Sequence, residues 1–180
     1  VAFTRVYTAR AIFPSPVAVN NLRLEAEFLI SATEAADSNC DLFVGFCSDE
    51  TAITGDSNVA GFRYFGSSGA DTGGTWYAYT HTVGSGLNTK TNTGVAIDTG
   101  SSILDQVLRI EMFGSGTGEG QRIRFYINGV LKANHTTSLP NVAMKLNFFV
   151  QSNNSAVLKI LHVGAVGVHW NTMNQAALYR

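Results

Sequence analysis

Short segments in which apolar and polar residues alternate follow one another along most of the chain. The clearest is LRLEAEFLI, residues 22–30, in which every second residue is apolar and an arginine and two glutamates lie between. Successive side chains of a strand point to opposite faces, so this pattern predicts strands with one buried face. Many of the 18 glycines cluster between such segments, where they mark turns. The sequence therefore predicts about ten to thirteen short, mostly antiparallel strands.

A second strong signal is QRIRFYINGVLKA, residues 121–133. Its first half alternates, and Asn128-Gly129 then reverses the chain. Asn-Gly favours a type I′ turn, whose twist matches that of the flanking strands. We expect a hairpin with Arg122 and Arg124 on one face, available to an anionic glycan or a neighbouring subunit.

Length and composition indicate one domain that carries little charge. The 180 residues suffice for a single core, and 45% of them are apolar. Only 14% are charged, against about a quarter in an average soluble domain. We expect residues 1–180 to form one β-sandwich, with residues 1–20 as an N-terminal arm or edge strand. No apolar run reaches the roughly 18 residues of a membrane span, so no membrane contact is expected.

The placement of the charges argues against a nucleic-acid-binding protein, and the placement of the cysteines argues against a disulfide. All 13 acidic residues lie within the first 119 positions, and every charged residue after them is basic. Strands from both halves interleave in a sandwich, so we expect the charges to mix; no basic cluster indicates nucleic acid. Cys40 and Cys47 fall in one expected strand, more than about 20 Å apart at about 3.3 Å per residue. A disulfide needs about 7 Å or less between Cα atoms, so both are expected as buried free thiols.

The order of LRLEAEFLIS, LFVGFC, TWYAY, VLRIEMF and RIRFYINGVLKANHTTSLP resembles the concanavalin A-like lectin/glucanase jelly roll. This resemblance implies an all-β fold, a two-sheet antiparallel jelly-roll sandwich. The texture of low charge and many Gly, Ser, Thr and Asn residues is similar to that of bacteriophage tail fibre, spike and capsid decoration domains. The second resemblance implies a virion-surface or extracellular location and a homo-oligomer, often a trimer.

The acidic residues show no known catalytic pattern. A retaining glycosidase needs two carboxylates about 5 Å apart. Laminarinase-like members of the superfamily carry theirs in an E-x-D-x-E strand, which this sequence lacks. Glu25 and Glu27 share one strand face, but a solvated role explains them. No G-x-S-x-G, H-x-H or H-x-x-x-H motif is present. We therefore expect a protein without enzymatic activity.

Two alternatives remain open at this point. One is a glycanase or lyase whose acids come from different strands, with Glu25, Glu27, Asp105 and Glu111 as candidates. Residues 109–112, RIEM, resemble a strand of jelly-roll alginate lyases, but isoleucine replaces its hydroxyl residue and no Q-I-H triplet exists. Two carboxyls about 5 to 9.5 Å apart in a groove would favour an enzyme. The other alternative is a purely structural capsid or tail protein without a ligand.

Glycan binding is the preferred function, with attachment to host-surface carbohydrate as the role. Sugars stack on aromatic rings, and TWYAYTHT, residues 75–82, supplies three of them. If Trp76 is buried, Tyr77, Tyr79 and His81 form an exposed stripe beside Arg63 or Tyr64 on a neighbouring strand. If the register is reversed, Trp76 is exposed. The candidate ligand-binding residues are Trp76, Tyr77, Tyr79, His81, Arg63 and Tyr64.

We expect no cofactor, with calcium as the alternative. Asp37, Asn39 and Asp41 alternate in ADSNCD and offer the oxygen ligands that calcium prefers. Ordinary turn chemistry explains the same residues.

Overall fold

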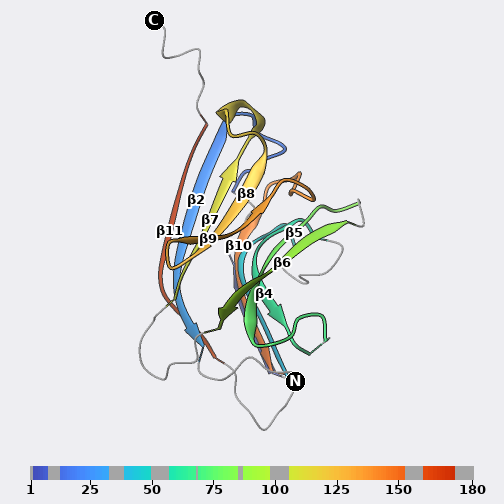
Figure 1. The fold of residues 1–180 in the computed structure, drawn as a ribbon, viewed down its shortest axis with the longest axis vertical. Coiled ribbons are helices and arrows are strands. Elements are labelled where there is room, and N and C mark those ends of the chain that lie inside the picture. Colours follow the sequence, from blue (N-terminus) through green and yellow to red (C-terminus); the bar gives the residue numbers. More distant parts are fainter. Residues whose placement is uncertain are drawn as a thin grey trace, which may run out of the picture.

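The structure is a computed structural model and describes residues 2–7, 13–32, 39–49, 57–67, 69–84, 87–97, 106–152 and 160–172. In these ranges, two antiparallel sheets pack face to face (Figure 1). The six-stranded sheet has the order β1-β10-β3-β4-β5-β6, and the five-stranded sheet has the order β11-β2-β7-β8-β9. The strands are β1 (Ala2–Tyr7), β2 (Leu22–Ala32), β3 (Cys40–Cys47), β4 (Val59–Phe65), β5 (Thr75–His81), β6 (Asn88–Ala96), β7 (Gln106–Phe113), β8 (Arg122–Ile127), β9 (Val130–His135), β10 (Lys145–Ser152) and β11 (Leu161–Thr172).

The expected all-β, two-sheet antiparallel sandwich is confirmed. Within the segment 1–20, strand β1 forms an edge of the six-stranded sheet and pairs with β10. No helix of the described ranges is long and apolar enough to cross a membrane.

The core lies between the sheets and follows the alternation of the sequence. The even-numbered residues of β2 from Leu22 to Ile30 are at most 1% exposed, as predicted. Phe125 of β8 meets Phe62 of β4 edge to face, with ring centroids 5.4 Å apart. Such aromatic pairs contribute about 0.5–1.5 kcal/mol beyond the burial of their area.

Two local predictions are also confirmed. Asn128 and Gly129 have φ values of 50° and 77°, as a type I′ turn requires. All eight residues of β3 are buried, since the strand lies inside the sheet and both its faces are covered. Cys40 and Cys47, at its two ends, are buried and are not joined in a disulfide, as predicted.

Gly61 of β4 lets an aromatic ring lie directly on the backbone. A Cβ atom at this position would stand 2.5 Å from the ring of Phe43 and 2.8 Å from the carbonyl oxygen of Val44. No rotamer of the substituted residue avoids a clash that starts at Cβ. The glycine is therefore required for the packing of the outer face of this sheet.

We expect Gly61→Ala to lower the free energy of unfolding by about 2 kcal/mol, because Phe43 must leave its position. Thermal unfolding followed by circular dichroism measures the effect. Gly167→Ala in β11 is the matched control, since a Cβ there meets no atom within 4 Å. Equal losses of melting temperature in the two variants would contradict the conclusion that Gly61 is required for this packing.

Candidate functional site

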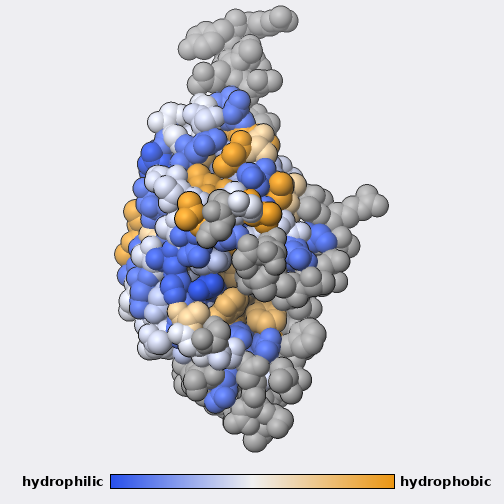
Figure 2. Space-filling model, turned by 90° about the vertical axis from the view of Figure 1, so that its right-hand side faces the viewer, coloured by the Kyte–Doolittle hydropathy of each residue, from blue (hydrophilic) through white to orange (hydrophobic). Residues whose placement is uncertain are grey.

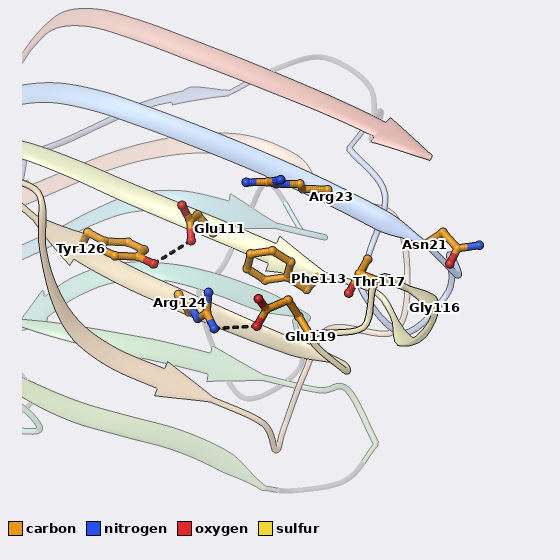
Figure 3. Close-up of a pocket in the computed structure, with 9 residues that line it drawn as sticks. All are labelled: Asn21, Arg23, Glu111, Phe113, Gly116, Thr117, Glu119, Arg124 and Tyr126. Carbon is orange, nitrogen blue, oxygen red and sulfur yellow. Dashed lines mark hydrogen bonds and ion pairs between the residues drawn. The ribbon is translucent and has the colours of Figure 1, made fainter. Parts of the chain in front are cut away.

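A pocket lies on the outer face of the five-stranded sheet, where β2 begins and β7 ends (Figure 3). Its volume is about 350 Å³. The turn η1 (Ser115–Thr117), which follows β7, forms one of its walls. The lining residues are Asn21, Arg23, Glu111, Phe113, Gly116, Thr117, Glu119, Arg124 and Tyr126.

Strand alternation brings the charged residues to this face. Glu111 lies between two fully buried core residues of β7, and Arg124 lies between two of β8. These apolar neighbours point into the core, so the polar side chains must point outward. Glu111 and Arg124 are directly opposite each other in the β7–β8 register. The hairpin that the sequence predicted thus contributes one side of the pocket.

Tyr126 holds the carboxylate of Glu111. Its hydroxyl donates a hydrogen bond to Oε2 of Glu111 at 2.7 Å (Figure 3). The guanidinium of Arg109 stacks 4.1 Å from the centre of the tyrosine ring. Burial, followed by the hydrogen bond to Glu111, raises the pKa of Tyr126 above its ordinary value of 10.0. The phenol therefore stays protonated at neutral pH and remains a donor to the carboxylate.

A second carboxylate, that of Glu25, lies beside Glu111. The two residues are directly opposite each other on β2 and β7. Nη1 of Arg109 is 3.5 Å from Oε1 of Glu25 and 3.6 Å from Oε1 of Glu111, so these oxygens are at most about 7 Å apart. The side chain of Glu25 is 41% exposed and that of Glu111 is 12% exposed. One carboxylate is thus open to solvent and the other is enclosed.

The opposite side of the pocket is formed by Glu119, after η1. Nη2 of Arg124 donates to Oε2 of Glu119 at 2.7 Å, and Nη1 of Arg122 is 3.6 Å from the same oxygen. These pairs join residues only three and five positions apart, so they are local contacts, and the expected mixing of charges between the two halves of the chain stays a prediction. Arg23 and Arg124 lie on either side of the Phe113 ring (Figure 3), with guanidinium carbons 5.9 Å and 5.1 Å from its centroid.

The residues predicted to bind a ligand lie in the other sheet and divide between its two faces. Trp76 and Tyr64 point into the core and are 0% and 3% exposed. The side chains on the outer face are close together, but each is at most 8% exposed, so the expected exposed stripe is not found. This second group consists of Arg63, Tyr77, Tyr79 and His81. Its role in ligand binding stays a prediction.

A buried ion-pair network occupies that outer face. The carboxylate of Asp71 accepts hydrogen bonds from Lys90 Nζ at 2.9 Å and from Arg63 Nη2 at 3.3 Å. Arg63 also lies 4.0 Å from the centre of the Tyr79 ring, and burial raises the pKa of Tyr79. On the side of the molecule where this sheet lies, the described surface is mainly hydrophilic with scattered hydrophobic residues (Figure 2). The Asp71 carboxylate thus pairs with two basic side chains of the same face, Arg63 and Lys90.

The expected calcium ligands and one candidate acid fall partly outside the described residues. Asp37 and Asp105 both lie there. Asp41 accepts hydrogen bonds from the backbone nitrogen and the hydroxyl of Ser67. In the described part of the chain, no group of three or more His, Cys, Asp or Glu side chains is placed to hold a metal ion.

Sequence reasoning named Glu25 and Glu111 but missed Glu119, Arg23 and Tyr126 as site residues. Glu119 stands in a glycine-rich turn, where an acid carries no signal of its own. The signal that was available is the polar face of three strands: β2 and β7 carry arginine and glutamate there, and β8 carries two arginines. Only the pairing of β2 with β7 and of β7 with β8 turns these faces into one surface.

Solved structures of low sequence identity share the fold. Endo-1,3-β-glucanase from Streptomyces sioyaensis matches with a TM-score of 0.52 and 14% identity, over 82% of this chain and 58% of the glucanase. The carbohydrate recognition domain of Emp47p matches with a TM-score of 0.57 and 6% identity, over 86% of this chain and 74% of that domain. The polysaccharide lyase family 18 protein aly-SJ02 matches with a TM-score of 0.55 and 9% identity, over 94% of this chain and 79% of the lyase. No protein-family model matches the sequence, and no curated protein is similar to it.

These likenesses establish the concanavalin A-like jelly roll as the fold. They also correct the expectation that the domain is not an enzyme, because a glucanase and a polysaccharide lyase are among the proteins that share it. The expectation rested on the lack of a same-strand acid pattern. The structure brings Glu25 and Glu111 together from different strands, so the lack of a same-strand pattern does not argue against an enzyme.

Proposed function

We propose that the domain is a polysaccharide-degrading enzyme, a retaining glycoside hydrolase with Glu111 as nucleophile and Glu25 as acid and base. The observation that carries the proposal is the position of these two carboxylates. They come from opposite positions of adjacent strands and share one arginine, and Glu111 lines the pocket. Polysaccharide-degrading enzymes on the same fold support the assignment.

The spacing of the carboxylates favours retention of the anomeric configuration. Directly opposite residues of antiparallel strands have Cβ atoms about 4.5–5.5 Å apart. Retaining glycosidases hold their carboxyl groups about 5–5.5 Å apart, whereas inverting enzymes need about 6.5–9.5 Å to admit a water. The two oxygens are at most about 7 Å apart. This bound includes the whole range of retaining enzymes and only the lower end of the range of inverting enzymes.

In the first step, the carboxylate of Glu111 attacks the anomeric carbon of a sugar in the pocket. The glycosidic C–O bond breaks, and Glu25 gives its proton to the leaving oxygen. In the second step, Glu25 takes a proton from water, whose oxygen attacks the anomeric carbon and releases Glu111. Tyr126 is a positioning residue, since its hydrogen bond fixes the orientation of the Glu111 carboxylate.

The test is incubation of the domain with neutral and acidic polysaccharides, followed by measurement of new reducing ends. We expect reducing ends without the ultraviolet absorbance of an unsaturated sugar, because hydrolysis leaves no double bond. Proton NMR of the first product should show the anomeric configuration of the substrate. No new reducing ends on any polymer would refute the enzyme, and an inverted product would refute Glu111 as nucleophile.

The host-glycan partner, the virion-surface or extracellular location and the homo-oligomer stay predictions. Their support is the low charge and the Gly, Ser, Thr and Asn content of the chain. An enzyme that degrades surface polysaccharide is compatible with each of them.

A further inference from the structure

We propose that Arg23 is a specificity-determining residue, which binds an anionic group on the sugar chain, a carboxylate or a sulfate. The inference deepens the proposed function and rests on it for the position of the substrate. Its starting point is an arginine in the pocket whose charge no carboxylate balances.

The other charges in the pocket and beside it balance one another. Arg109 pairs with Glu25 and Glu111, and Glu119 pairs with Arg122 and Arg124. Three arginines thus meet three glutamates in the network. Each of these guanidinium groups is already engaged with a carboxylate of the protein, so none is the first choice for a ligand.

Arg23 stands outside this network although it lines the same pocket. Among the described residues, no carboxylate lies within 4.0 Å of its guanidinium, and its side chain is exposed. Its neighbours across the strands are Phe113 on β7 and Asn171 on β11, neither of which carries a charge. The pocket therefore presents one uncompensated positive charge with its hydrogen-bond donors open to a ligand.

The place of Arg23 suits a substituent of the sugar rather than the reacting bond. Figure 3 shows Arg23 and Arg124 on opposite sides of Phe113, with Glu111 beside them. A guanidinium forms two parallel hydrogen bonds with a planar carboxylate, and it also binds sulfate oxygens. A neutral sugar would leave this charge without a partner, and such a mismatch is the usual source of discrimination between substrates.

The experiment measures binding to the Glu111→Gln protein, which does not turn the ligand over. The probes are oligomers of galacturonic acid and of glucuronic acid, each with its carboxyl-reduced neutral counterpart, and dextran sulfate with dextran. We expect at least one anionic probe to bind about 10-fold or more tightly than its neutral partner. Preference for a uronate oligomer identifies a carboxylate as the ligand, and preference for dextran sulfate alone identifies a sulfate.

Substitution of Arg23 in the same background then assigns the preference to this residue. Arg23→Gln should abolish it, and Arg23→Lys should keep part of it, because lysine keeps the charge but not the fork of donors. Lys132→Gln on β9 is the control for a general loss of positive charge, since Lys132 does not line the pocket. Equal binding of all anionic and neutral probes, or a preference that survives Arg23→Gln, would overturn the inference.

Failure of this inference and failure of the proposed function give different results. A domain that cleaves neutral polymers as well as acidic ones is an enzyme without the anion subsite. A domain that binds uronates through Arg23 but cleaves no polymer has the subsite without the activity.

Discussion

Glu111→Gln is expected to lower kcat on a cleaved polysaccharide by about 10³-fold or more, with little change in melting temperature. The amide cannot attack the anomeric carbon, so no glycosyl–enzyme ester forms. It keeps the size of the carboxylate and can still accept the hydrogen bond from Tyr126. Steady-state kinetics on wild type and variant measure the loss, and thermal unfolding shows that the fold is intact.

Two further glutamates of β2 make this prediction specific. Glu25→Gln should lower kcat about 10²-fold or more on a natural glycoside, and much less on an aryl glycoside whose leaving group needs no proton. Glu27→Gln is the matched control, because Glu27 shares the strand and the outer face and is exposed, but lies opposite Arg109 rather than opposite Glu111. Equal activity of the Glu111 and Glu27 variants would exclude the carboxylate pair as the reaction centre.

Most of the fold could be predicted because most strands carry a signal of their own. Alternation in β2 and the Asn128-Gly129 turn are local features, and each of them specifies a local structure. The site is different, because Glu25 and Glu111 are far apart in the sequence and meet only through the β2–β7 register. No short motif records that pairing. Within one strand, only Glu25 and Glu27 have a suitable spacing, whereas Glu25 and Glu111 are recognisable from the sequence only as separate candidates.

The segment TWYAYTHT shows a second limit, because bulky residues lie on both of its faces. Either Trp76 or Tyr77 could face the core on grounds of hydrophobicity alone. The structure decides for Trp76, whose Nε1 donates to Oε1 of Gln106 at 2.8 Å in the interior. A buried indole needs such a partner. Gln106 lies on the other sheet, so the sequence around Trp76 gave no sign of it.

The second large effect is a loss of stability at acidic pH, and it follows from a histidine that lies between the edges of the two sheets. His135 of β9 is 3% exposed. Its Nδ1 lies 3.1 Å from the hydroxyl of Thr80 on β5, and its Nε2 lies 3.0 Å from the hydroxyl of Thr91 on β6. Burial lowers the pKa of His135 from 6.5 to about 4. A neutral ring thus connects the five-stranded sheet to the six-stranded sheet.

The direction of the pH effect follows from which state binds the proton. The unfolded chain protonates this histidine as the pH falls through 6.5, whereas the folded protein does so only near pH 4. Protons therefore favour unfolding in this window. The free energy of unfolding should be highest above pH 6.5 and should fall by up to about 3 kcal/mol as the pH is lowered to about 4.

Urea unfolding at a series of pH values between 7 and 4 measures this loss. His135→Gln replaces the ring by an amide that does not titrate, so the variant should be less stable than wild type at pH 7 but lose less stability on acidification. The difference between the two proteins should shrink as the pH falls, because the wild type alone carries the histidine that resists protonation. His169→Gln removes an exposed histidine of β11 and should keep the wild-type slope. If His135→Gln keeps that slope as well, the acid sensitivity arises from other groups.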